Sequence, residues 1–150
     1  KIQFSTALLA FSFHTASFQK VHDFLTVGAA APLQEAAIAG LTMRDEYYRT
    51  LQQMYTDRRD LFLNGLSRLQ IAHTIPQGAY YVMVDISEYG YEDDEAFCVD
   101  MARKVGVAAV PGSSFFKEKE NRYIRLHFAK QESTLLEALN RMENMGRMKK

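Results

Sequence analysis

Apolar residues recur at helical spacing in the first half of the chain. In the second half they alternate along a strand at 123–128, form a near-continuous run at 79–86 and return to helical spacing in two further segments. Residues 20–42 predict a short helix, a bend at Gly28–Pro32 and a second helix that begins at Pro32. Leu33–Leu41 carries small residues on several faces, which permits close packing against another helix. We interpret it either as an ordinary buried helix or as a contact with another subunit or domain.

The longest helical pattern covers Met43–Leu69. At 1.5 Å per residue it would be about 40 Å long, which exceeds what a domain of this size needs internally. We therefore expect it to connect two parts of a protein. Its apolar stripe is interpreted as core rather than as a ligand site, and consists of Met43, Tyr47, Leu51, Met54, Tyr55, Phe62, Leu66 and Leu69.

A strand and a further helix are predicted after Pro76–Gly78, where proline and glycine interrupt regular structure. Ala79–Ile86 is rich in aromatic and β-branched residues, and its near-continuous apolar run predicts burial on both faces. The acids at 92–95 begin a helix that runs to about Lys104, and they complement the helix dipole. We interpret these acids as structural rather than as a metal site. The buried stripe of this helix consists of Phe97, Met101 and Val105.

A short strand at Val107–Val110 ends in a Pro-Gly turn, and a charged connector at 117–122 leads into a strand around Arg125. Successive side chains of a strand alternate between its faces. Ile124, Leu126 and Phe128 therefore face a core, while Tyr123, Arg125 and His127 lie on the opposite face. A mid-strand arginine of this kind either forms a planar pair with a carboxylate ligand or bridges to a nearby Glu on a solvated face.

The last helix is introduced by Thr134, with Glu137 three residues later at capping-box spacing. Its apolar residues are Leu135, Leu136, Leu139, Met142 and Met145. Helices and strands in this order predict a small sheet with helices packed against it, of the α/β or α+β class.

Composition narrows the choice of partners. A chain of 150 residues with 47% hydrophobic content suits a domain of ordinary size. Its 18 basic and 18 acidic residues balance, so neither nucleic acid nor an anionic membrane is expected as a partner. Cys98 is the single cysteine, which indicates a reducing, cytoplasmic location, and we interpret it as a buried thiol rather than a nucleophile.

Residues 1–17 have the outline of a signal peptide, but polar residues dilute the apolar run, and Ile2–Gln19 is too polar to span a membrane. The four histidines are scattered, and the chain has no Gly-rich phosphate loop, nucleophile elbow or Cys/His metal cluster. No catalytic residue and no metal site is therefore predicted from the residues alone.

Four segments of the chain resemble, in order, blocks of the class I/II pyridoxal-phosphate aminotransferases, most closely the kynurenine and methionine aminotransferase-like branch. The segments are Lys20–Glu35, Pro76–Asp85, Gly106–Phe115 and Tyr123–Ala129. The resemblance implies the C-terminal portion of a fold-type-I enzyme. It divides the chain into a divergent segment at 1–19, a stretch between domains at 20–42 and the small domain at 43–150.

The resemblance also implies functional residues. Arg125 would bind the α-carboxylate of an amino acid or 2-oxo acid, and Gly78, Tyr80 and Ser113 would lie near the substrate entrance. The complete family enzyme, expected to be a homodimer, transfers an amino group from an amino acid to a 2-oxo acid with pyridoxal 5'-phosphate. Lys1 does not match the family's Schiff-base lysine block, so that role is not assigned to it, and 1–19 looks like foreign sequence in a truncated gene.

Three hypotheses follow from this resemblance. The first is a substrate-binding and domain-closing part of an aminotransferase that is inactive alone. The second is a non-catalytic module that binds amino acids or oxo acids through Arg125. The third is a remnant without a ligand, whose uncovered helix faces would make it associate.

Overall fold

The computed structural model describes residues 15–25, 30–118 and 120–149. The chain divides into two compact units, Lys1–Asp45 and Glu46–Lys150. Predictions for residues 1–14 lie outside the described residues. Among the helices of the described ranges, none combines the length and the apolar character that crossing a bilayer requires.

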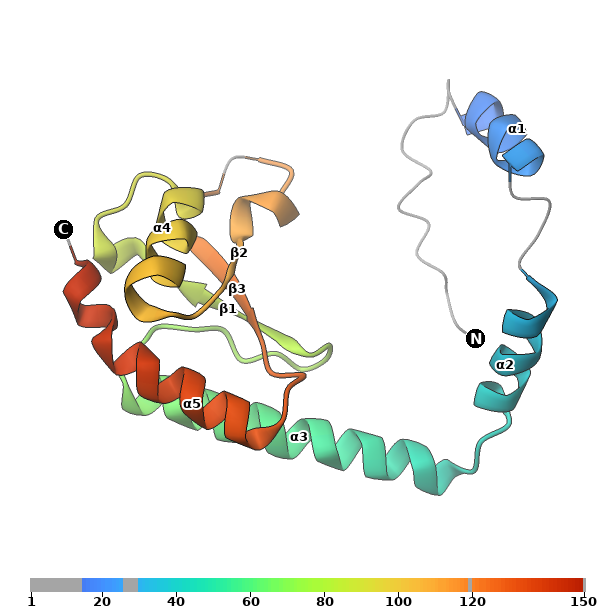
Figure 1. Ribbon diagram of the computed structural model, residues 1–150, viewed down its shortest axis with the longest axis horizontal. Helices are drawn as coiled ribbons and strands as arrows, with labels where there is room; N and C mark the ends of the chain where they lie inside the picture. The colour runs from blue at the N-terminus through green and yellow to red at the C-terminus, as the bar shows by residue number, and fades with distance from the viewer. Residues whose placement is uncertain (1–14, 26–29, 119, 150) are drawn as a thin grey trace. The chain divides into compact units, whose positions relative to one another are not determined.

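The described residues of the first unit form the helices α1 (Thr15–Leu25) and α2 (Ala31–Leu41) (Figure 1). Pro32 lies in the first turn of α2, where its missing N–H would have had no helical partner. No residue of α2 is buried, and Leu33 is 68% exposed. The interpretation of this segment as an ordinary buried helix is therefore wrong for the described chain, whereas a contact with another domain or subunit stays a prediction.

The second unit begins in α3 (Asp45–Arg68), close to the bounds predicted for the long helix. Its buried residues are confined to its last third: Phe62, Leu63, Gly65 and Leu66. Met43 and Tyr47 are exposed, so the prediction that they belong to the core is wrong. The amphipathic spacing is present there, but no element of the described second unit buries that part of the helix.

A three-stranded antiparallel sheet forms the centre of the second unit, with the spatial order β1-β3-β2. The strands are β1 (Tyr81–Asp85), β2 (Val110–Pro111) and β3 (Tyr123–His127). One face is buried through Val82, Val84, Ile124 and Leu126. The predicted alternation along β3 is confirmed, but burial of β1 on both faces is wrong, because in this antiparallel sheet only one face is covered.

Both edges of the sheet are protected. Beyond β1, His73 forms a bridge with Val84, and the Thr74 N–H donates to the Met83 carbonyl at 2.9 Å. The other edge strand, β2, has only two residues, one of which is Pro111. Neither edge therefore offers a long row of unpaired backbone groups.

The short 3₁₀ helix η1 (Ser87–Tyr89) leads to α4 (Asp94–Asp100), which continues as a π-helical turn, η2 (Met101–Val105). The Asp93 side chain caps α4 by accepting from the Glu95 N–H at 2.8 Å. The predicted buried stripe is confirmed at Phe97, Met101 and Val105, and Cys98 is buried as expected. A second 3₁₀ helix, η3 (Gly112–Phe115), follows β2.

The chain ends in α5 (Glu132–Met142) and the 3₁₀ helix η4 (Glu143–Met148). The capping box predicted at Thr134 is wrong, because α5 begins two residues earlier with Gln131 as its N-cap and has no side-chain cap bond. Glu137 instead accepts from Arg141 one turn later, at 2.7 Å. Of the predicted stripe, Leu136 is exposed, whereas Leu135, Leu139, Met142 and Met145 are buried against the sheet and α3.

Candidate functional site

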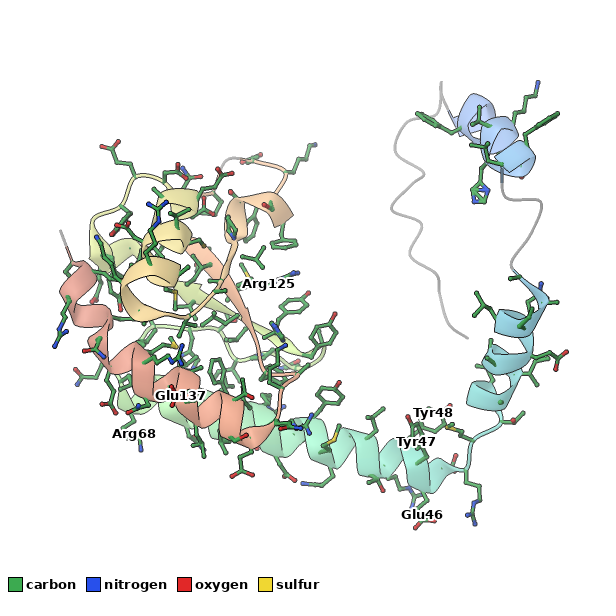
Figure 2. The ribbon with its side chains drawn as sticks, viewed as in Figure 1. Glu46, Tyr47, Tyr48, Arg68, Arg125 and Glu137 are labelled. Atoms are coloured by element: carbon green, nitrogen blue, oxygen red, sulfur yellow. The ribbon has the colours of Figure 1, made fainter. Side chains whose placement is uncertain are left out.

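Arg125 lies at the centre of β3, opposite Met83 of β1 and Val110 of β2. Because β3 is the middle strand, both neighbours fix its backbone by ladder hydrogen bonds. Its neighbours in sequence, Ile124 and Leu126, are buried, so the Arg125 side chain emerges on the opposite, open face of the sheet. The position predicted for this side chain is therefore the position observed (Figure 2).

Two aromatic rings flank the guanidinium of Arg125. Its Cζ atom lies 3.9 Å from the centroid of the Phe115 ring on η3 and 5.0 Å from that of the Tyr81 ring on β1. Such contacts attract a cation to the face of the ring and restrict its rotation. Among the described residues, the Arg125 guanidinium is therefore in contact with aromatic rings rather than with carboxylates.

Within the described residues, no carboxylate forms an ion pair with Arg125. The sequence left open a bridge from this arginine to a nearby Glu, and the described part of the chain contains no such bridge. A guanidinium donates its hydrogen bonds in its own plane, so stacked rings leave these donors available. The site can therefore bind a planar anion such as a carboxylate.

Ser113, predicted near a substrate entrance, lies on the same short helix as Phe115. Its backbone N–H donates to Asp94 Oδ2 at 2.8 Å and its hydroxyl donates to Asp94 Oδ1 at 3.0 Å. The Ser113 hydroxyl hydrogen is thus committed to a residue of α4. A direct contact of Ser113 with substrate stays a prediction.

Tyr80 and Gly78, the other two predicted residues, precede β1. The Tyr80 ring lies edge-to-face on the Tyr81 ring, with centroids 6.0 Å apart, which places it one ring away from Arg125. Gly78 is exposed, and a Cβ built on it would meet nothing within 4 Å. Tyr80 therefore belongs to the aromatic surroundings of Arg125, and a binding role for either residue stays a prediction.

Sequence reasoning missed Tyr81, Phe115 and Asp94 as parts of this site. Alternation along β1 could have found Tyr81, because its register places it on the same face as Arg125. Phe115 and Asp94 carry no comparable signal. Their contacts join residues that the fold brings together from different elements, and local spacing does not report such pairs.

The electrostatics around the site are set by burial and by neighbouring charges. Partial desolvation of the ring lowers the pKa of His127, although the residue is exposed, and the positive charges of Lys130 and Arg125 lower it further. Burial also raises the pKa of the Cys98 thiol to about 11, with a further contribution from Asp94. A thiol that keeps its proton is a poor nucleophile, in agreement with the structural interpretation of Cys98.

The lysines of the described residues do not fit a Schiff-base site for pyridoxal phosphate. All of them are exposed, and two are paired with acids, Lys104 with Asp100 at 2.8 Å and Lys149 with Glu88 at 3.2 Å. A lysine that attacks a carbonyl must lose its proton, which requires desolvation or a neighbouring cation. The described part of the chain therefore does not by itself supply this group.

Comparisons with known proteins place these observations in a family. The model of aminotransferase class I and II matches residues 15–142. Methionine aminotransferase of Escherichia coli is 36% identical over 132 residues, covering 87% of this chain and 34% of the relative. A probable N-succinyldiaminopimelate aminotransferase of Mycobacterium tuberculosis is 30% identical over 137 residues, with coverage of 85% and 34%. The chain thus spans about a third of the length of these relatives.

Solved structures agree with the sequence comparisons. The crystal structure of E. coli YbdL, described as a methionine aminotransferase, superposes with a TM-score of 0.72 at 36% identity, over 86% of this chain and 34% of that one. The M. tuberculosis N-succinyldiaminopimelate aminotransferase gives a TM-score of 0.74 at 32% identity, over 85% and 34%. The fold is therefore part of the fold of these enzymes, and the chain belongs to the class I and II aminotransferases.

Proposed function

We propose that this chain supplies substrate binding to an aminotransferase, with Arg125 binding the α-carboxylate of an amino acid or 2-oxo acid. The observation that carries the proposal is Arg125, a half-buried residue on the central strand whose guanidinium is flanked by the Phe115 and Tyr81 rings and has no acid partner in the described residues. An arginine so fixed can form the two parallel N–H···O bonds that define the orientation of a carboxylate.

The remaining parts of the proposal follow the family. Class I and II aminotransferases depend on pyridoxal phosphate in general, and this group carries the chemistry of amino transfer when it is bound. The exposed lysines described above support the proposal that the 150-residue chain is inactive alone. In the complete enzyme, 43–150 would form the small domain that closes over the substrate, and 20–42 would join it to the rest.

Titration calorimetry with 2-oxobutanoate and with alanine tests the carboxylate role. Loss of charge-assisted hydrogen bonds in Arg125→Ala is expected to weaken binding by about ten- to a hundredfold. Arg125→Lys should fall between, since an ammonium keeps the charge but not the planar pair of donors. Arg122→Ala is the matched control, because Arg122 is exposed and lies near Glu120 at 3.7 Å. Absence of binding by the unaltered chain, or equal binding by Arg125→Ala, would refute the proposal.

A second candidate, a binding module without catalysis, is favoured by the same lysine exposure. Borohydride reduction of the chain mixed with pyridoxal phosphate separates it from a catalyst. Mass spectrometry should show only scattered, substoichiometric pyridoxyl adducts on surface lysines. One stoichiometric adduct at a single lysine, together with amino transfer by the isolated chain, would establish the catalyst instead.

A further inference from the structure

The short helix η3 is fixed to β3 at its first residue. A Cβ placed on Gly112 would lie 2.3 Å from the backbone oxygen of Tyr123 and 2.8 Å from its carbonyl carbon. No side chain fits into that contact, because the atoms it meets belong to backbone of the central sheet. Glycine at position 112 therefore allows η3 to lie directly on the strand that carries Arg125.

The next residue, Ser113, fixes η3 to α4. Asp94 is 1% exposed, and it is the buried charged residue of the described chain. Its two carboxylate oxygens accept from the backbone N–H and the hydroxyl of Ser113, at 2.8 Å and 3.0 Å. Displacing η3 would leave this buried carboxylate without those partners, which is costly. The hydrogen bonds therefore resist movement of η3.

Phe115 is the last residue of η3, and its ring lies 3.9 Å from the Cζ atom of Arg125. The ring is half exposed, so its position does not come from packing in the core. The attachments of η3 at Gly112 and at Ser113 instead fix the backbone of the same four-residue helix that carries this ring. Tyr81 contacts the same guanidinium from the neighbouring strand, at 5.0 Å.

We propose that Phe115 is a positioning residue for Arg125, and that Asp94 acts through Ser113 to hold Phe115 in place. The effect on carboxylate binding rests on the proposed function. The positioning itself rests only on contacts between described residues. Without the ring, the long Arg125 side chain would sample more rotamers and would lose more entropy on binding a carboxylate. Ser113 would then serve the site by attaching η3 to Asp94, whether or not it also contacts substrate.

The positioning itself is tested in the ligand-free chain by NMR of the arginine Nε–Hε groups. The Arg125 signal is expected to be shifted by the ring current of Phe115. Phe115→Leu should move it toward the position of an ordinary exposed arginine, and Phe115→Tyr should leave it in place. Phe116→Leu is the matched control on the adjacent residue, whose ring faces Tyr123 instead, with centroids 6.1 Å apart.

Asp94 does not need to touch Arg125 to affect the same signal. Asp94→Asn replaces one acceptor by a donor, and Ser113→Ala removes only the hydroxyl bond, so both should move the Arg125 signal part of the way. Ser113→Ala keeps the test valid if Asp94→Asn fails to fold. An Arg125 signal that is unchanged in Phe115→Leu, or unchanged in both Ser113→Ala and a folded Asp94→Asn, would overturn the inference.

Affinity for 2-oxobutanoate gives the functional readout. Phe115→Leu is expected to bind about two- to fivefold more weakly, as for loss of an exposed cation–π contact, and Phe115→Tyr should restore the affinity. If Arg125→Ala abolishes binding while Phe115→Leu binds as tightly as Phe116→Leu, the inference fails and the carboxylate role stands. If Arg125→Ala binds 2-oxobutanoate normally, while the unaltered chain shows the ring-current shift of its Arg125 signal, the carboxylate role fails and the positioning contact stands.

Discussion

Helices α2 and α5 have the same length, 11 residues, but they stand in opposite situations. Helix α5 buries Leu135, Leu139 and Met142, whereas α2 buries no residue. The apolar positions of α5 lie along one stripe, and those of α2 are spread among alanines over several faces. The local sequence thus forms a helix in both places, but of these two helices only α5 has buried residues.

The difference shows where the stability of the described chain resides. Isolated helices of this length are marginal in water, so a helix such as α5 depends on its packed face. Helix α2 has local support instead, from Pro32 in its first turn and from the Thr42 hydroxyl, which donates to the Ile38 carbonyl at 2.9 Å. We therefore expect the second unit to unfold cooperatively and α2 to contribute little to that transition.

The largest test of this comparison is a pair of leucine truncations. Leu139 is 3% exposed, so Leu139→Ala should lower the free energy of unfolding by about 2–5 kcal/mol through lost burial and a cavity. Leu33→Ala in α2 should change it by less than about 0.5 kcal/mol. Urea unfolding followed by tyrosine fluorescence measures both. Similar losses in the two variants would show that α2 is packed after all.

A pair of glycine substitutions tests the same contrast with a smaller effect. A Cβ on Gly65 of α3 would meet the buried Leu139 side chain, so the cost of overpacking should exceed the gain in helix propensity, and Gly65→Ala should destabilise the second unit by up to about 2 kcal/mol. A Cβ on Gly40 of α2 would meet nothing within 4 Å. Gly40→Ala should therefore favour its helix by about 0.5–1 kcal/mol, seen as slower amide exchange in α2. A gain in stability for Gly65→Ala would contradict the close α3–α5 contact.

The buried thiol of Cys98 provides a pH test of the packed unit. Its pKa is raised from 9.0 to about 11 in the folded protein, so above pH 9 the unfolded chain loses this proton first. The folded state then binds more protons, and its stability falls as the pH rises from 9 toward 11, by about 1 kcal/mol at pH 10. The stability difference between the unaltered chain and Cys98→Ala should shrink over this range. A constant difference would mean that the thiol titrates normally.

The smallest expected effect concerns His127. Its pKa lies below 6.5 in the folded protein, through partial desolvation of the ring, Lys130 and Arg125, so the unfolded chain takes up this proton first as the pH falls. The contribution of His127 to stability is therefore lost as the pH falls below about 6.5. In an NMR titration, Arg125→Ala should raise the midpoint of His127, and bound 2-oxobutanoate should raise it in the unaltered chain. A His127 midpoint that changes neither with Arg125→Ala nor with bound 2-oxobutanoate would show that the guanidinium charge does not act on His127.

Much of the second unit could be predicted from local rules. The period-two pattern of β3 assigned Ile124 and Leu126 to the core and Arg125 to the open face, because a strand cannot turn one side chain without its neighbours. The helical stripe of Phe97, Met101 and Val105 was equally informative. In both cases the element buries one face, and the spacing of its apolar residues is enough to identify that face.

The remainder depended on information that spacing does not contain. The first half of α3 has the pattern of a packed helix, yet Tyr47 is 49% exposed, because burial requires a partner as well as a pattern. The bonds from Ser113 to Asp94 join residues 19 positions apart. Thr134 and Glu137 match a helix-start motif but lie inside α5, which begins at Glu132, and Glu137 pairs with Arg141 instead.

The protected edges of the sheet determine how this chain can self-associate. A second copy cannot extend the sheet at β2, which offers two residues and lacks an N–H at Pro111, or at β1, where Thr74 already bonds Met83. Growth of this described sheet by strand addition, the route to ordered fibrils, is therefore disfavoured in the folded state. Concentrated protein should instead gather through the apolar side chains of its helices, giving amorphous clusters that mild detergent disperses.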